Sequence, residues 1–317
     1  MNHLHFVDKY GSFTMDKPEN VSYLYFPMAS ETGLKSSLTP NLGGDAKIDQ
    51  ETFLLEPVSA ENLHSNRGVR NFWLVDEDGQ AFSVSGASAR QEADRFTPAQ
   101  DDSRLTAGLM WQTVERTAQD LGLDTEVTAF CPWQDNVEIL CITVRNQQEQ
   151  PRWLTPIAAV PLYGRSADNI RDHRNVTSML HRIWTTENGV MVRPTMSFDE
   201  RGHRPNHKVY YVEGFGPEGQ KPEAFYPTVE SFWARAGTYL HPRAVYEQYP
   251  GVKAGSRAEG REAMGAFRFP AITLAPGQEA HYVLLLGVED SEEAVNAIWD
   301  KYHSWEQVQA VLDEDRK

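Results

Sequence analysis

Residues 136–146, NVEILCITVRN, decide the fold because they are apolar on both sides of an extended chain. Side chains alternate across a β-strand. One face would carry Val137, Ile139 and Cys141, and the other Leu140, Ile142 and Val144. A strand that is apolar on both faces is typical of a sheet covered on both sides. We therefore expect these residues to form a central strand of a large sheet.

Short apolar segments of a similar kind recur along the chain, separated by Gly, Pro, Asn and Asp. They are residues 21–28, 52–58, 71–86, 104–117, 125–133, 152–164, 190–198, 208–216, 263–274 and 280–288. Within 71–86, two apolar runs flank Asp76-Glu77-Asp78-Gly79, which is typical of a hairpin turn. Many short strands without alternating helices favour stacked antiparallel sheets over a parallel α/β fold. The predicted fold class is all-β, with a large antiparallel β-sandwich.

Residues 290–317 change from strand signals to helix signals. Asp290 with Glu293 predicts a helix start, and Ser304 with Gln307 predicts a capping box and a second start. The apolar stripes of the two helices are Val295, Ile298, Trp299 and Tyr302, then Trp305, Val308, Val311 and Leu312. The sequence stops without a helix-ending Gly, Asn or Pro. We expect a β-sandwich domain over residues 1–289 and a short helical linker over 290–317 whose continuation is missing.

The composition excludes several classes of function. The 317 residues include 30 Lys and Arg against 45 Asp and Glu, a net charge of −15, which argues against binding to nucleic acid or to anionic membranes. The start of the sequence lacks the basic and apolar segments of a signal peptide, and no run of about 18 apolar residues could span a membrane. We expect a cytoplasmic protein. The cysteines, Cys131 and Cys141, lie in strand-like segments and are expected to be buried free thiols.

Residues 161–208 carry a net positive charge, whereas the whole chain is negatively charged. This stretch carries eight Lys and Arg and five Asp and Glu, a balance of +3 within an acidic chain. Arginine and histidine beside aspartate and asparagine can bind carbohydrate hydroxyls or an anion such as phosphate. The alternative is a solvated loop whose charges pair with one another.

Short motifs give little support for a nucleotide or metal site. Gly214-Phe215-Gly216-Pro217-Glu218-Gly219 matches GxGxxG, but Pro222 follows where a phosphate-binding helix would begin. His203 and His207 have HxxxH spacing, but Pro205 between them argues against the helix that would align both rings. We expect no bound metal.

Several longer segments together resemble one family. They are residues 10–45, 52–73, 84–97 (VSGASARQEADRFT), 161–183 (PLYGRSADNIRDHRNVTSMLHRI), 197–206 and 262–267 (EAMGAF). The chain is similar in these segments to the N-terminal part of glycoside-hydrolase family 94 phosphorylases, and most similar to members that act on β-1,2-linked gluco-oligosaccharides. The likeness extends from about Tyr10 to the terminal helices.

The resemblance implies a supersandwich followed by a helical linker and an (α/α)6 barrel that holds the general acid and the phosphate site. No residue of this chain matches that general acid, so none is assigned as catalytic. The chain would be the sandwich and linker alone, a subunit or fragment of an inverting phosphorylase, with a separate barrel subunit as its partner. Inorganic phosphate would be a co-substrate and no cofactor is implied. An oligosaccharide ligand and an oligomeric assembly are also implied.

The resemblance further implies one set of substrate-binding residues. In related phosphorylases an Arg-Asn pair on a sandwich loop approaches the acceptor-side sugar, and the matching pair here is Arg174-Asn175. Asp172 and His173 would be supporting neighbours. Guanidinium and amide groups bind neighbouring hydroxyls through paired hydrogen bonds, and Asp172 can hold the Arg174 side chain. An interface or purely structural role for the same loop remains the alternative.

Two other functions fit parts of the sequence. A stand-alone β-sandwich carbohydrate-binding protein would use the same loop without a barrel. A mutarotase-like epimerase would need a histidine and a glutamate that converge in a groove. The candidates for that pair are His181, His203 and His207 with Glu187 and Glu200, and their spacing does not select among them.

Overall fold

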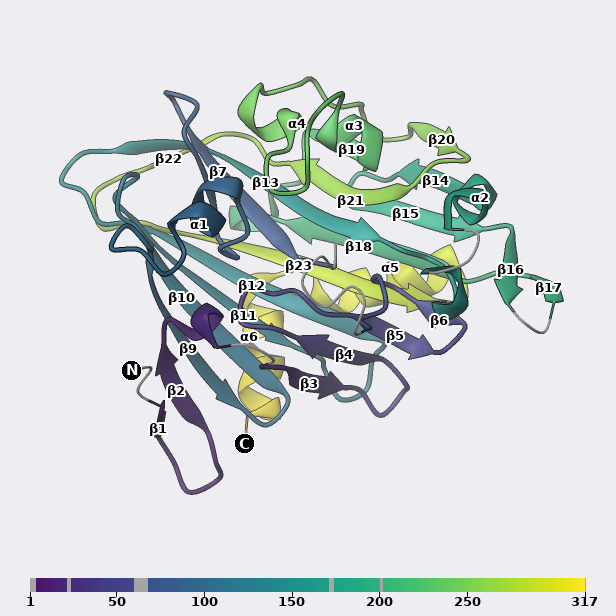
Figure 1. Ribbon diagram of the computed structural model, residues 1–317, viewed down its shortest axis with the longest axis horizontal. Coiled ribbons are helices and arrows are strands. Elements are labelled where there is room, and N and C mark those ends of the chain that lie inside the picture. The colour runs from purple at the N-terminus through teal and green to yellow at the C-terminus, as the bar shows by residue number, and fades with distance from the viewer. Residues whose placement is uncertain (1–3, 22–23, 60–67, 171–173, 200–201, 317) are drawn as a thin grey trace.

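Strand β12 (Val137–Asn146) lies inside the largest sheet of the computed structural model, between β11 (Leu123–Phe130) and β23 (Glu279–Glu289) (Figure 1). Both neighbours run antiparallel to it. Its even-numbered apolar side chains join one buried cluster and its odd-numbered ones another. The prediction of a central strand covered on both faces is confirmed. The structure describes residues 4–21, 24–59, 68–170, 174–199 and 202–316.

The largest sheet has eleven strands within the described residues. Their order is β1-β2-β9-β10-β11-β12-β23-β18-β15-β14-β20, and each neighbouring pair is antiparallel. The bounds of the other strands are β1 (Leu4–Phe6), β2 (Phe13–Asp16), β9 (Asp102–Gly108), β10 (Trp111–Ala118), β14 (His181–Thr185), β15 (Gly189–Pro194), β18 (Val209–Phe215) and β20 (Arg257–Glu259).

A second antiparallel sheet stacks on the large one. Its order is β19-β21-β13-β7-β8, and β22 pairs with β13. The bounds are β7 (Asn71–Asp76), β8 (Ala81–Ser83), β13 (Arg152–Leu162), β19 (Ala224–Thr228), β21 (Ala263–Arg268) and β22 (Ile272–Leu274). The predicted hairpin at 71–86 is confirmed as β7 and β8, and Gly79 in its turn has a φ of 78°.

A small sheet and a separate hairpin complete the strands. The small sheet has the order β3-β4-β5-β6, with β3 (Phe26–Ala29), β4 (Lys35–Leu38), β5 (Ala46–Asp49) and β6 (Thr52–Phe53). The hairpin pairs β16 (Met196–Asp199) with β17 (Gly202–Pro205) and extends from one end of the molecule (Figure 1).

The helical segments are short and lie around the sheets. They are α1 (Ala89–Asp94), α2 (Arg174–Thr177), α3 (Val229–Trp233), α4 (Arg243–Tyr246), α5 (Glu292–Tyr302) and α6 (Trp305–Asp315). Short 3-10 turns are η1 (Pro18–Asn20), η2 (Ala167–Ile170), η3 (Ser178–Leu180) and η4 (Pro217–Gly219). The chain is therefore mostly β, as predicted, with a minor helical part.

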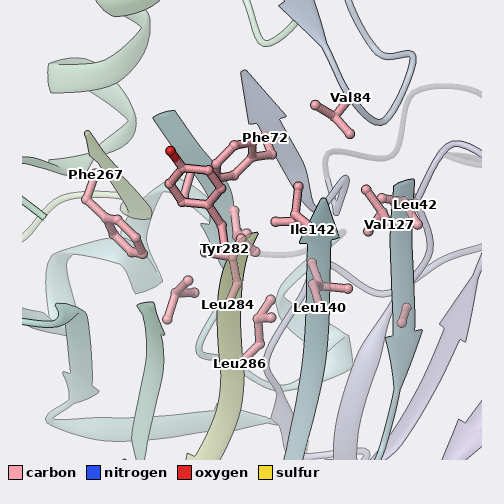
Figure 2. Close-up of a cluster of buried hydrophobic side chains, with 14 of the residues drawn as sticks. Leu42, Phe72, Val84, Val127, Leu140, Ile142, Phe267, Tyr282, Leu284 and Leu286 are labelled. Carbon is pink, nitrogen blue, oxygen red and sulfur yellow. The ribbon is translucent and has the colours of Figure 1, made fainter. Parts of the chain in front are cut away.

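The main core lies between the large sheet, the second sheet and the small sheet. Figure 2 shows Leu140 and Ile142 of β12 beside Leu284 and Leu286 of β23, with Phe72 of β7 above them. The ring of Phe72 lies 5.1 Å from the ring of Tyr282, measured between centroids. Burial of such a cluster is the main favourable contribution to folding.

Two further clusters cover the outer faces. Helices α5 and α6 pack on the outside of the large sheet, where Val295, Ile298 and Val308 meet Ile139 and Leu285. Helices α3 and α4 cover the second sheet in the same way through a separate cluster. Both helical stripes predicted for the end of the chain therefore face the sheet.

Several predicted boundaries are wrong in detail. Residues 104–117 form parts of two strands, because the chain turns at Met110, whose φ is 65°. Helix α5 is capped by Ser291 rather than Asp290. Ser304 accepts the backbone N–H of Gln307, which is one half of the predicted capping box. Cys131 and Cys141 are buried and free, as predicted.

A buried ion pair links the three sheets. Arg70, directly before β7, donates from Nε to Glu138 Oε1 of β12 at 2.7 Å and from Nη2 to Oε2 at 2.9 Å. Both side chains have zero exposure. Ser36 of β4 donates to the same carboxylate at 2.5 Å, and the Arg70 guanidinium also donates to the carbonyls of Gly43 and Asp45. The pair meets the condition for stable buried charges, which is complete hydrogen bonding.

We predict that Glu138→Gln lowers the free energy of unfolding by about 3–5 kcal/mol, because the Arg70 charge would remain buried without a carboxylate. The double variant Arg70→Met/Glu138→Leu should be much less destabilised, since it leaves no buried charge. Urea unfolding followed by tryptophan fluorescence measures both, and the exposed Glu77→Gln is the matched control. Equal loss in the single and double variants would show that the charge pair is not the cause.

Candidate functional site

The loop between β13 and β14 contains the predicted substrate-binding residues. It leaves Leu162, passes through η2, α2 and η3, and enters β14 at the end of the molecule where the β16–β17 hairpin extends (Figure 1). Arg174 and Asn175 begin helix α2, but their side chains lie outside the described part of the chain. Asp172 and His173 lie outside the described residues altogether. The roles of these four residues therefore stay predictions.

The start of this loop is held by a buried arginine. Arg165 is 4% exposed, and its guanidinium contacts the carboxylate of Glu262 on the segment before β21, with Nη1 donating to Oε1 at 3.1 Å. The same Nη1 donates to Thr177 Oγ1 of α2 at 3.3 Å. Arg165 Nε donates to the carbonyl of Tyr163 at 3.0 Å. One cation thus ties the beginning of the loop, its helix and the second sheet together.

Two polar side chains attach the loop to the β16–β17 hairpin. Ser166 Oγ donates to the carbonyl of Phe198 at 3.1 Å, and Asn169 Nδ2 donates to the same oxygen at 2.8 Å. Backbone bonds also join the loop to β6, where Phe53 N–H donates to the Arg165 carbonyl at 3.0 Å. The loop is therefore held by the β16–β17 hairpin on one side and by β6 on another.

The end of the loop is held by a buried histidine. His181, the first residue of β14, is fully buried, and its Nδ1–H donates to the carbonyl of Arg261 at 3.2 Å. Burial first, and then the positive charge of Arg165, lower the pKa of His181 to about 4. The ring is neutral at pH 7 and holds the loop as a packed, uncharged group.

Other cations of the stretch 161–208 are paired with carboxylates elsewhere in the chain. Arg204 Nη2 lies 2.7 Å from Glu51 Oε2, and Arg182 Nε lies 3.6 Å from Glu259 Oε2. Lys208 contacts Asp290. The partners that the structure shows for these three residues lie on other segments of the chain. This pairing compensates much of the local positive charge.

The histidine–glutamate pair required for an epimerase is not formed by the described candidates. His181 is buried against Arg261, whereas Glu187 is exposed and contacts Lys221. His203 is exposed on β17, with its ring 4.5 Å from that of Phe198 between centroids. His207 is also exposed, and Glu200 lies outside the described residues. The described members occupy separate environments, so the epimerase hypothesis is not supported.

Within the described ranges, no three His, Cys, Asp or Glu side chains are grouped so that they could hold a metal ion. None of the helices in the described part of the chain is long and apolar enough to cross a bilayer.

The arrangement suits presentation of a loop rather than proton transfer. The Glu262 carboxylate is bound to Arg165, and His181 resists protonation, so both side chains serve to position the backbone. The pairing of Arg165 with Glu262 was not predicted from the sequence. Both residues lie in the segments 161–183 and 262–267 that carry the family resemblance, but nothing in either segment indicates that their side chains meet.

One protein-family model matches most of the chain. The family model described as glycosyl hydrolase 94, supersandwich domain, matches residues 46–305. No curated protein matches.

Solved structures are similar at low identity. A bacterial glucoamylase complexed with acarbose is 7% identical with a TM-score of 0.43, and the match covers 94% of this chain and 36% of that chain. A GalM/aldose epimerase homologue from C. elegans is 10% identical with a TM-score of 0.43, over 85% and 99% of the two chains. Heparinase III is 11% identical with a TM-score of 0.39, over 92% and 37%. This chain thus spans only about a third of the glucoamylase. TM-scores below 0.5 say nothing about the activity of this chain.

We predict that acid weakens this end of the molecule through His181. Its pKa of about 4 in the folded chain lies below the ordinary 6.5, so the unfolded chain binds more protons between these values. The stability that the neutral His181 ring contributes above pH 6.5 is therefore lost as the pH falls toward 4. Between pH 7.5 and 5 the loss attributable to His181 should be about 2 kcal/mol.

Urea unfolding of His181→Gln at both pH values measures this contribution. The variant should lose about 2 kcal/mol less than the natural sequence over the same interval. The exposed His303→Gln is the matched control and should behave like the natural sequence. An unchanged pH dependence in His181→Gln would contradict the assignment.

Proposed function

The chain belongs to the glycosyl hydrolase 94 supersandwich family, and from this we propose that it is the sandwich part of an inverting glycoside phosphorylase. The match over residues 46–305 carries the proposal. A separate (α/α)6 barrel would be the partner and would supply the general acid and the phosphate site. The assembled enzyme would need no cofactor.

The proposed substrates are β-1,2-linked gluco-oligosaccharides and inorganic phosphate, as for 1,2-β-oligoglucan phosphorylase. A phosphate oxygen would attack the anomeric carbon opposite the glycosidic oxygen, and the glycosidic C–O bond would break. A general acid would protonate the leaving oxygen of the shortened glucan. Attack from the opposite face inverts the β-bond, so the product is α-glucose 1-phosphate. The segments 161–183 and 262–267 are the basis for this choice of substrate.

The proposed contribution of this chain is the loop that carries Arg174 and Asn175. These side chains would donate hydrogen bonds to vicinal hydroxyls of the acceptor-side sugar, with Asp172 and His173 as neighbours. Support comes from the anchors of the loop at Arg165, which restrict how its backbone can move. Restricting a binding loop lowers the entropy lost when a ligand binds.

The same end of the molecule offers apolar surface for a partner. Val176 of α2 is 60% exposed, Met179 of η3 is 64% exposed and Met196 of β16 is 36% exposed. Methionine adapts its shape to different contacts and is enriched at interfaces. We propose that these side chains contact the barrel subunit around the sugar site, and that the assembly is oligomeric.

The test is retention of a catalytic partner. Tagged chain produced in its native host should retain a barrel polypeptide, and the eluate should release α-glucose 1-phosphate from sophoro-oligosaccharides only when phosphate is present. The isolated chain should have no such activity. Turnover by the isolated chain, or retention of no barrel polypeptide, would contradict the proposal. Glucan binding without a partner would instead favour a stand-alone carbohydrate-binding protein.

We predict that Arg174→Ala raises the KM of the assembled enzyme for the oligosaccharide roughly tenfold or more, as expected for loss of a charged hydrogen bond. The partner should still co-purify. Arg182→Ala is the matched control, because Arg182 lies in the same basic stretch but is exposed and paired with Glu259. Steady-state kinetics of both variants measure the difference, and an equal effect of the two substitutions would contradict a specific role for Arg174.

A further inference from the structure

A cavity of about 400 Å³ lies at the other end of the sandwich. It is bounded by α1, the segment 98–102, the turn 118–121 and Tyr246 of α4, whereas the loop with α2 lies at the opposite end (Figure 1). Small-molecule sites occupy about 300–1,000 Å³. The size of the cavity is therefore that of a ligand site.

One wall of this cavity is a fixed polar network. Gln91 of α1 donates from Nε2 to Asp101 Oδ2 at 2.7 Å and to the carbonyl of Ser83 at 3.0 Å. Gln100 donates from Nε2 to Asn20 Oδ1 at 2.9 Å and to Glu19 Oε1 at 3.0 Å. Desolvation raises the pKa of Asp101 above its ordinary value, which reflects its partial burial in this wall. These side chains are oriented before any ligand arrives.

A buried arginine behind the same wall has unused donors. Arg116 of β10 is 4% exposed, and its Nη1 lies 3.4 Å from Glu19 Oε1. Its Nε and Nη2 have no hydrogen-bond partner among the described residues. Arg116 lines a small cavity of about 20 Å³, and the lining of this cavity shares Gln91, Gln100 and Asp101 with the large one. That volume holds about one water molecule or one hydroxyl group.

Glycine at residue 86 leaves room for the guanidinium in this position. A Cβ on Gly86 would lie 2.5 Å from Arg116 Nη2, and the φ of Gly86 is +76°. Buried donors without partners destabilise a fold. Nε and Nη2 of Arg116 therefore have donor capacity left for a polar group that occupies the small cavity.

The lining selects the chemistry of the ligand. Charged side chains on the large cavity are two cations and four aspartates, a balance of −2, which disfavours phosphate and other anions. Carboxylate and amide groups instead bind neutral hydroxyls. The rings of His241 and Tyr246 stack at 3.8 Å between centroids and form an aromatic edge to the cavity. Flat aromatic surface beside polar groups suits the apolar face of a sugar ring.

We infer that the cavity between α1, the turn 118–121 and Tyr246 is a second carbohydrate site that binds a neutral oligosaccharide. Asp101 and the amide oxygen of Gln91 accept hydrogen bonds from ring hydroxyls, and the His241–Tyr246 pair contacts the sugar face. One hydroxyl, directly or through water, reaches Arg116. The site does not depend on the loop of Arg174, so the inference stands independently of the proposed phosphorylase function.

Calorimetry and hydrogen–deuterium exchange of the full chain test this site with sophorotriose, cellotriose and maltotriose as probes. At least one trisaccharide should bind and protect the backbone amides of residues 88–101 and 118–121 from exchange. Asp101→Asn and Tyr246→Ala should each weaken binding about tenfold or more. Asp101→Asn preserves the shape of the side chain, so its effect remains readable if Tyr246→Ala is unstable.

Two controls make the outcome decisive. Arg174→Ala should leave binding and protection at 88–101 unchanged, as should Glu77→Gln in the exposed β7–β8 turn. No heat with any trisaccharide would overturn the inference, and so would protection confined to residues 166–180. Binding of spermidine in place of sugar would also overturn it, because the acidic lining would then be a cation site.

Discussion

The pairing of Arg70 with Glu138 is the directional constraint between the stacked sheets. These residues come from the start of β7 and from β12, and Ser36 of β4 completes the hydrogen bonds, so one polar cluster joins three sheets. Apolar contacts alone are non-directional and would tolerate sliding of one sheet over another. A buried charge tolerates little displacement, because its attraction and its hydrogen bonds depend on geometry. The ion pair therefore fixes the register between layers that the hydrophobic cores hold together.

The loop at the α2 end uses the same physical device. Arg165 is buried like Arg70, contacts the carboxylate of Glu262 and donates further bonds to Thr177 and to a backbone carbonyl. Glu262 directly precedes β21, a strand that pairs with β13, from which the loop begins. The loop is thus attached to β13, from which it starts, and also to the segment that leads into β21, the neighbour of β13. Such attachment explains how an irregular segment between two sheets can keep one position without regular hydrogen bonding of its own.

The sequence predicts those parts of the fold that depend on local periodicity. The two faces of β12, the β7–β8 hairpin and the apolar stripes of α5 and α6 follow from side-chain alternation and helical spacing. The turn at Met110 was missed because a non-glycine residue at positive φ leaves little trace in composition. The ion pairs could not be predicted, since Arg165 and Glu262 are 97 positions apart and only the fold brings them together. For the same reason charge counting in 161–208 could not show that several of its cations have carboxylate partners on distant segments.

The three buried arginines differ in how completely the surrounding residues accept their hydrogen bonds. Each guanidinium nitrogen of Arg70 has an acceptor, and Arg165 binds a carboxylate, a hydroxyl and a carbonyl. Arg116 differs, because two of its nitrogens have no acceptor among the described residues although it is equally buried. A purely structural arginine in this fold is surrounded by acceptors, as the first two demonstrate. Arg116 lines a cavity that is large enough for one polar group and shares lining residues with a ligand-sized space. The physical role of Arg116 is therefore completed only by a group from outside the folded chain, either water or a hydroxyl of a bound molecule.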